Sequence, residues 1–234
     1  MNLHSFAPQN LAHKAAVLID RTLPHKLAVM IEKCRGLDFS TVVQPEAVGL
    51  DPGLSHWSSP SRTKYLAMVL NDFKVTSRDS IIDVGCGKGS AMRTMLRFPF
   101  AHIDGVELSD HLGSIAKRNF ERLNASRTNV FVCNAALLSN YDLYNIVYFF
   151  NPFPCSVMSL VVDRLVESLN RKERELVLIY NNATCNEVIV GTGIFATLGF
   201  YPDRWGNGMF VYSNYRGNKS RLSGNMRMQR HSAP

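Results

Sequence analysis

From Asp79 onward, short apolar runs alternate regularly with longer amphipathic segments. The short runs are rich in β-branched and aromatic residues, and the longer segments carry apolar residues at helical spacing. Strands that alternate with helices form parallel sheets, because each helix carries the chain back to the start of the next strand. The sequence therefore predicts a doubly wound α/β sheet.

The expected elements follow one another closely. Strands are predicted at 80–84, 101–107, 130–133, 146–150 and 176–180. Helices are predicted to begin near Ser90, at Ser109 or Asp110, at Ser156 and near Glu187, the last with a capping box of Thr184 and Glu187. In the helix after Ser109 the apolar residues recur on one face, namely Leu112, Ile115, Ala116 and Leu123. The helix after Ser156 is expected to turn its apolar residues inward, namely Val157, Leu160, Val161, Leu165 and Leu169. An antiparallel hairpin, 199–205 and 209–213 around Gly206-Asn207-Gly208, is expected to complete the sheet.

The chain divides into three parts. Residues 1–75 have helical patterning around 11–34, interrupted at Pro24, and predict a helical lead-in or cap. Residues 76–213 form the α/β domain. Residues 214–234 carry five Lys and Arg residues and no acidic residue, which predicts a disordered basic tail. Such a tail binds phosphates of a nucleic acid or another acidic partner, or is simply solvated.

Composition excludes several classes of protein. Wholly apolar stretches such as 146–150 are far shorter than the roughly 20 residues that cross a bilayer, so no membrane span is expected. Five widely spaced cysteines without a C-x-x-C pair argue against a disulfide framework and a zinc site, and favour a reducing cytoplasm. The seven histidines show no metal-ligand spacing, so no metal is proposed.

A glycine-rich loop with the pattern D-x-G-x-G-x-G lies between the first strand and its helix, where the backbone can approach a ligand closely. Its residues are Asp83, Gly85, Cys86, Gly87, Lys88 and Gly89. An ATP-binding Walker A loop would need Gly at position 82 and Ser or Thr at 89, and the chain has Ile82 and Gly89. A dinucleotide-binding loop would need Gly at position 90, where the chain has Ser90. This difference weakens the dinucleotide interpretation without excluding it.

Glu107 ends the second predicted strand, twenty residues after Gly87, and Leu108 follows it. A carboxylate at this place can accept hydrogen bonds from both ribose hydroxyls of an adenosine ligand. Enzymes that use NAD place an acid similarly. Glu107 therefore indicates a ligand that contains adenosine, but it does not distinguish NAD from other adenosine cofactors.

The D-x-G-x-G-x-G loop resembles the first motif of the class I S-adenosylmethionine (SAM) dependent methyltransferases, and the resemblance extends over about residues 79–213. It implies a Rossmann-like fold with SAM as cofactor and S-adenosylhomocysteine (SAH) as product. It also implies that the loop, including Cys86, holds the methionine part of SAM and that Asp83 helps to orient its amino group. On physical grounds the loop amides and the helix start could receive the SAM carboxylate, while Asp83 offsets the cofactor's positive charges. Lys88 either touches that carboxylate or projects into water.

Two further segments match the family less closely. Asn134 and Ala135 follow the third strand, where the family commonly has an Asp that contacts the adenine amine. An amide can still bond the adenine edge, and a plain turn Asn is the alternative. Ser59 and Pro60 precede a helix at the place where related enzymes cover the methionine end of SAM; the alternative is a simple helix cap.

Asn151-Pro152-Phe153-Pro154 follows the fourth strand, where amino-methyltransferases carry an Asn/Asp-Pro-Pro-aromatic sequence. The resemblance implies that the Asn151 oxygen and a backbone carbonyl hold the acceptor nitrogen, while Phe153 stacks on a planar substrate. The aromatic residue stands third and the second proline fourth, which departs from the family's order. The alternative is a proline-rich connection without chemistry.

Together these motifs predict an enzyme that transfers a methyl group from SAM to an unidentified acceptor, expected to be an amine of a protein, a nucleic acid or a small molecule. Two other functions remain open. One is an NAD(P)-dependent oxidoreductase, which shares the sheet, the loop and Glu107. The other is a non-catalytic nucleic-acid-binding module that uses the basic tail.

Overall fold

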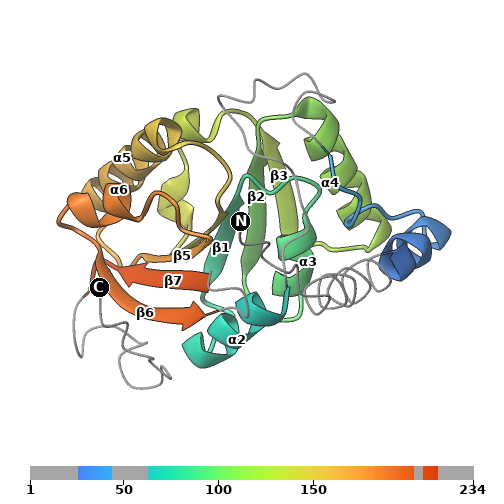
Figure 1. Cartoon of the computed structure of the whole chain (residues 1–234), viewed down its shortest axis with the longest axis horizontal. Coiled ribbons are helices and arrows are strands. Elements are labelled where there is room, and N and C mark those ends of the chain that lie inside the picture. Colours follow the sequence, from blue (N-terminus) through green and yellow to red (C-terminus); the bar gives the residue numbers. More distant parts are fainter. Residues whose placement is uncertain (1–25, 44–62, 203–207, 216–234) are drawn as a thin grey trace, which may run out of the picture.

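The centre of the molecule is a seven-stranded sheet with the order β3-β2-β1-β4-β5-β7-β6 (Figure 1). The computed structural model describes residues 26–43, 63–202 and 208–215. Strands β1 to β5 run parallel, while β7 is antiparallel to both β5 and β6. The strands are β1 Ser80–Val84, β2 His102–Glu107, β3 Thr128–Val132, β4 Ile146–Phe150, β5 Val177–Asn181, β6 Ala196–Pro202 and β7 Gly208–Ser213. The doubly wound α/β sheet with a terminal antiparallel hairpin is thus confirmed.

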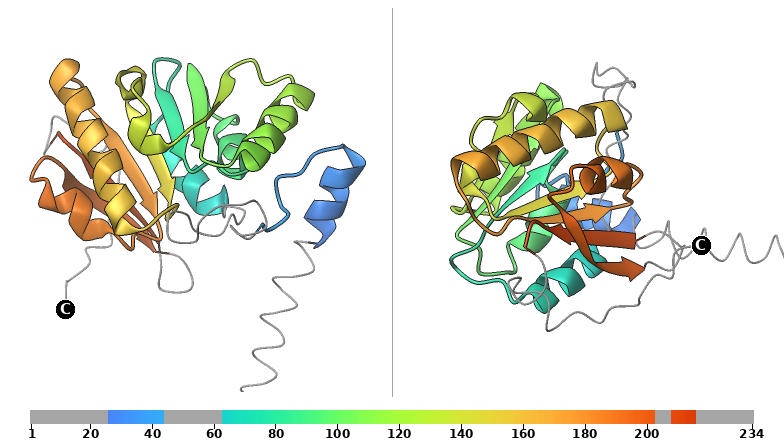
Figure 2. Two further views of the ribbon diagram at one scale, coloured as in Figure 1. Left: turned by 90° about the horizontal axis from the view of Figure 1, so that it is seen from above. Right: turned by 90° about the vertical axis from the view of Figure 1, so that its left-hand side faces the viewer.

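Helices cover both faces of this sheet (Figure 2). They are α2 Thr63–Phe73, α3 Ser90–Met95, α4 Asp110–Arg122, α5 Cys155–Arg171 and α6 Asn186–Gly191, with short 3-10 turns at Ala135–Leu137 and Tyr141–Leu143. Helices α2, α3 and α4 pack on one face, and α5 and α6 on the other. The strand order reverses between β1 and β4, and ligands of such sheets bind at the carboxyl ends of the strands near this point.

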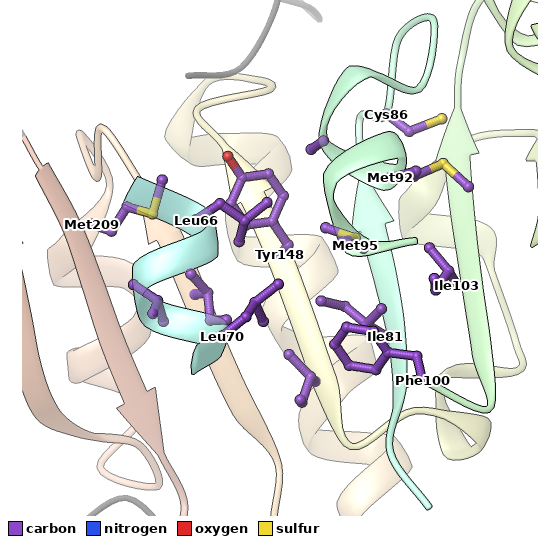
Figure 3. Packing of buried hydrophobic residues seen from close by; sticks show 14 of the residues in the cluster. Leu66, Leu70, Ile81, Cys86, Met92, Met95, Phe100, Ile103, Tyr148 and Met209 are labelled. Carbon is purple, nitrogen blue, oxygen red and sulfur yellow. The ribbon is translucent and has the colours of Figure 1, made fainter. Parts of the chain in front are cut away.

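Two hydrophobic clusters, one on each face, hold these layers together. Neighbouring residues of β1 point to opposite faces, so that Ile81 belongs to the cluster under α2 and α3 and Ile82 to the cluster under α5. Figure 3 shows the first cluster, in which Leu66 and Leu70 of α2 lie over Tyr148 of β4. All five residues of β1 are buried, as expected of a central parallel strand.

Several local expectations need correction. Leu160 of α5 is 55% exposed, although helical spacing had placed it inward. Leu123, which shares the apolar face of α4, is 38% exposed at the end of that helix. The capping box at α6 does not form: Cys185 is the N-cap residue and makes no side-chain cap, while the Thr184 hydroxyl bonds elsewhere. The hairpin turn, 203–207, lies outside the described residues.

Cys155 and Cys185 form a disulfide, which contradicts the expectation drawn from cysteine spacing. The two residues are 30 positions apart in sequence, but they stand at the starts of α5 and α6, with their Cα atoms 5.3 Å apart. The adjacent parallel strands β4 and β5 bring these helix starts together at the carboxyl end of the sheet. The disulfide removes one ground for expecting a reducing compartment.

The parts of the lead-in that the structure describes are residues 26–43, with a helix over 26–34, and the stretch from α2 onward. Pro24, Ser59, Pro60 and the tail beyond 215 lie outside the described residues. In the described part of the chain, no helix combines the length and the apolar character that a membrane crossing requires.

Candidate functional site

The predicted site residues gather at the carboxyl ends of β1 to β4, as the parallel sheet requires. Asp83 is in β1, Glu107 ends β2, Asn134 follows β3 and Asn151 follows β4. Because β1 lies between β2 and β4, the glycine loop after β1 has the other motifs on both sides. The carboxyl end of the sheet therefore carries the described residues of the candidate site.

Asp83 is a buried carboxyl group, with 3% of its surface exposed. No other described residue donates a hydrogen bond to its side chain, although nearly all buried carboxylates in proteins have such partners. Burial, together with the charge of Glu107, raises the pKa of Asp83 to about 8. A cationic group placed beside Asp83 would stabilise its charged form. The residue is thus suited to receive a positively charged ligand.

Glu107 is also buried, but its carboxylate has partners. Its two oxygens accept the backbone N–H groups of Gly87 at 2.8 Å and of Ser109 at 2.9 Å. Burial raises the pKa of Glu107, and these two amides act in the opposite direction. Each carboxylate oxygen has a second lone pair, so binding of ribose hydroxyls stays a prediction. In this structure Glu107 also ties the glycine loop to the end of β2.

The amides of the glycine loop are turned toward β2. Gly85 and Cys86 both donate to the Val106 carbonyl, at 2.9 and 3.1 Å, while Gly87 donates to Glu107. The expectation that the loop amides receive a cofactor carboxylate is therefore wrong for these three, because each already has a protein acceptor.

Two glycines of the loop are required by close neighbours. Gly85 has φ 78°, and a Cβ atom there would lie 2.4 Å from Cβ of Pro152. Gly89 has φ 86°, and its Cβ would lie 2.5 Å from the Phe120 ring. Gly85 thus lets the fourth motif approach the first, while Gly89 lets α4 pack against the loop. Cofactor contacts by either residue stay predictions.

The two other side chains of the loop point into the protein. Cys86 is 7% exposed and belongs to the core cluster, where burial raises the pKa of its thiol and keeps it protonated (Figure 3). Lys88 is 3% exposed, and its ammonium donates to the Asp38 carboxylate at 2.7 Å. The expectation that Lys88 projects into water was therefore wrong, whereas its contact with the cofactor stays a prediction.

Asn151 has an unusual backbone and an occupied side chain. Its φ is 40°, in the left-handed region that few residues other than glycine and asparagine adopt. Its Oδ1 atom accepts hydrogen bonds from the hydroxyls of Thr184, at 2.6 Å, and Tyr180, at 3.3 Å. These two residues near the end of β5 were missed as site residues, because Thr184 had been assigned to a helix cap and Tyr180 only to a strand.

The expectation for Phe153 needs correction. The ring is 6% exposed and lies in the cluster under α5, so it does not present a stacking face to a substrate in this structure. A proline on each side and a buried cluster below explain why an aromatic residue at this position packs inward.

The residues predicted to contact adenine make local contacts instead. Asn134 caps the 3-10 turn after β3, with its Oδ1 accepting the Ala136 amide at 2.9 Å, and the Ala135 carbonyl accepts the Tyr141 hydroxyl. Asn134 therefore acts as a turn residue, which was the alternative to contact with adenine. Leu108 is 40% exposed beside Glu107, where an apolar surface could contact a nucleoside. Within the described residues, no group of three His, Cys, Asp or Glu side chains could hold a metal ion.

Comparisons with known proteins agree on the fold. No family model matches the sequence. The chain is 28% identical over 101 residues to a ribosomal protein L11 methyltransferase of Chromobacterium violaceum, a match that covers 42% of this chain and 34% of that protein. The chain thus spans about a third of this curated relative.

Solved structures match more of the chain. Magnesium protoporphyrin IX methyltransferase from Synechocystis PCC 6803, with bound SAM, has a TM-score of 0.50 at 17% identity and covers 64% of this chain and 77% of its own. A SAM-bound amino pentose methyltransferase from Micromonospora echinaspora has a TM-score of 0.50 at 12% identity, with coverage of 65% and 90%. The mitomycin 7-O-methyltransferase MmcR has a TM-score of 0.51 at 14% identity, and the match covers 64% of this chain and 53% of MmcR. The fold is that of the SAM-dependent methyltransferases. The acceptors in these names differ, so the fold does not select one.

Proposed function

We propose that this protein is an enzyme that transfers the methyl group of SAM to a nitrogen atom of an acceptor molecule and leaves SAH as product. The observation that supports this most is Asp83, a buried carboxyl group without a hydrogen-bond partner in the described structure. It stands where the resemblance puts the amino group of SAM. The ammonium and sulfonium charges of SAM supply the cation that this carboxylate lacks.

The same observation argues against a nicotinamide dinucleotide. Such a cofactor would bring a negatively charged pyrophosphate to the glycine loop, beside Asp83 and Glu107. It would also need the loop amides as donors, and those of Gly85, Cys86 and Gly87 already bond to β2. The acidic charge beside the loop therefore favours SAM.

Methyl transfer requires little covalent chemistry from the protein. The lone pair of the acceptor attacks the methyl carbon, the carbon–sulfur bond breaks, the sulfonium becomes a neutral thioether, and the acceptor loses a proton to water. The enzyme has to hold the acceptor in line with this bond at about 3–3.5 Å. Pro152 lies directly against Gly85, so the Asn151 loop is next to the cofactor loop and can do this.

Asn151 is proposed to orient the acceptor nitrogen. Its Oδ1 is already bonded by Thr184 and Tyr180, so an acceptor N–H has to replace one of these donors. Thr184 is exposed, whereas Tyr180 is fully buried. In the proposed complex the acceptor N–H takes the place of the Thr184 hydroxyl, while Tyr180 keeps the asparagine in position.

The experiment is methyl transfer from [methyl-³H]SAM to protein, RNA and small-amine fractions, with Asn151→Ala as the test variant. Asn124→Ala is the matched control, because Asn124 also has a positive φ, 49°, and lies at the end of α4. Loss of orientation should lower transfer by Asn151→Ala on the order of 100-fold while SAM binding is kept. Equal activity of the two variants would refute the role of Asn151.

Two expectations about the cellular setting remain part of the proposal. The basic tail is proposed to hold a nucleic acid or another acidic partner near the enzyme. The cytoplasmic location is retained as a prediction, although the disulfide between Cys155 and Cys185 weakens one of its grounds.

A further inference from the structure

Lys88 of the glycine loop is bound to the N-terminal lead-in. Its ammonium donates to Oδ1 of Asp38 at 2.7 Å and also to the Thr41 hydroxyl. Burial of a lysine is costly unless it is paired and hydrogen-bonded, and this lysine has only 2% of its side chain exposed. The contact with Asp38 therefore fixes where the loop's only basic side chain lies.

Asn119 of α4 makes a second connection at the same place. Its amide nitrogen donates to the Lys88 carbonyl at 3.1 Å and to the Asp38 carbonyl at 2.9 Å. Its oxygen accepts the Asp38 amide at 2.9 Å. Asn119 is 2% exposed, and its side chain joins the loop, the lead-in and α4. A buried polar network with its members bonded in this way rigidifies the segments that it joins.

The lead-in is itself held in shape beside the loop. The buried carboxylate of Glu32 accepts the amides of Phe39 and Ser40, each at 2.9 Å, and the Ser40 hydroxyl. It also forms an ion pair, 2.8 Å long, with Arg93 of α3, the helix that follows the glycine loop. The Phe39 ring packs edge-on against Phe120, the residue that covers Gly89. Residues 32–41, here called the strap, thus contact the loop at Lys88 and the helix that follows it.

We propose that the strap sets the affinity of the glycine loop for SAM, with Asp38 as a positioning residue that acts through Lys88. This inference rests on the proposed function. A loop that is already ordered binds more tightly than one that must be ordered by the ligand, because the entropy cost has been met in advance. The strap is therefore part of the cofactor site without a direct contact to the cofactor.

The test is calorimetric titration of the full chain with SAM, at a temperature well below the unfolding midpoint of every variant. Asp38→Asn weakens the hold on Lys88 and should raise the SAM Kd on the order of tenfold. Asp142→Asn is the matched control, because it removes the ion pair with Arg171, 3.0 Å long, on the α5 side of the sheet. Its SAM Kd should equal that of the wild type.

A second variant covers the case in which Asp38→Asn fails to fold around a buried ammonium. Lys88→Met removes the ammonium itself, leaves the half-exposed Asp38 carboxylate to water, and should also raise the Kd. If the contact only stabilises the fold, both variants will have lower unfolding midpoints and an unchanged SAM Kd. That result would overturn this inference and leave the proposed function standing. A wild-type protein that binds no SAM overturns the proposed function and the inference with it.

Discussion

Asp83 and Glu107 place two buried carboxyl groups on adjacent parallel strands, at the same edge of the sheet. The register pairs Asp83 with Gly105, two residues before Glu107. Glu107 is bonded by two backbone amides, whereas the carboxyl group of Asp83 has no donor in the described structure. Burial and the neighbouring carboxylate both disfavour the charged form of Asp83, and a cation bound beside it would offset this cost, as expected of a functional site that lowers stability.

The first prediction concerns the pH dependence of folding. The pKa of Asp83 is raised from 3.8 to about 8, so the folded state keeps a proton that the unfolded state loses between these values. Stability of the wild type should therefore fall as pH rises from about 4 to 8, relative to Asp83→Asn, which does not titrate. Thermal unfolding at pH 5 and pH 9 measures this. Parallel pH profiles of the two proteins would show that Asp83 is not perturbed.

The second prediction concerns the close approach of the two motifs. In Gly85→Ala the new Cβ meets Pro152 at 2.4 Å and the backbone has φ 78°. Gly193→Ala is the control, because Gly193 has a similar φ of 69° with nothing within 4 Å of the Cβ position. The backbone strain costs about 1–2 kcal/mol in both variants, and the clash should add about 1–3 kcal/mol in Gly85→Ala alone.

Urea denaturation of the two glycine variants gives both free energies of unfolding. Equal losses would mean that Pro152 moves aside without cost and that the two loops are not packed together as described.

The third prediction concerns the disulfide. Cys155→Ser opens the covalent link between α5 and α6, which closes a loop of 30 residues. Without reductant, the free energy of unfolding should fall by about 3 kcal/mol, because the unfolded chain gains freedom. Cys34→Ser, at an exposed free cysteine, should change it little. The same stability for both variants would contradict a formed Cys155–Cys185 bond.

The fourth prediction concerns the basic tail. If residues 216–234 bind a nucleic acid through their five cationic side chains, affinity should fall steeply with salt, with a log–log slope on the order of −4. A chain that ends at residue 215 should lose this dependence and still bind SAM. Fluorescence anisotropy with a short RNA at several salt concentrations measures it. Salt-insensitive binding, or unchanged binding by the shortened chain, would exclude the tail as the contact.

Much of the fold is predictable from the sequence because each central strand has a local signal. The bounds of β1 and β4 match the predicted 80–84 and 146–150, since each is a short segment rich in β-branched or aromatic residues that ends beside a turn residue, Gly85 or Asn151. Helix faces were predicted less well. Leu160 has the spacing of an inward residue, but it is exposed to solvent on α5. Helical periodicity predicts the centre of the apolar face of a helix and does not define where that face ends.

The candidate site was predictable where it depends on strand ends and unpredictable where it depends on tertiary contacts. Asp83 and Glu107 follow from the rule that parallel strands end at one edge. The pair of Lys88 and Asp38 is 50 residues apart, and no periodic signal joins them. Thr184 carried a local capping signal, but its hydroxyl bonds Asn151 across the strand ends instead.

Calorimetric titration of the wild-type protein, Asp83→Asn and Gly87→Arg with SAM, SAH and NAD at pH 7.5 tests whether SAM is the cofactor and Asp83 its partner. We expect micromolar binding of SAM and SAH by the wild type, weaker SAM binding by Asp83→Asn, no binding by Gly87→Arg and no response to NAD. Binding of NAD without SAM, or SAM binding by Asp83→Asn as tight as by the wild type, would contradict this expectation.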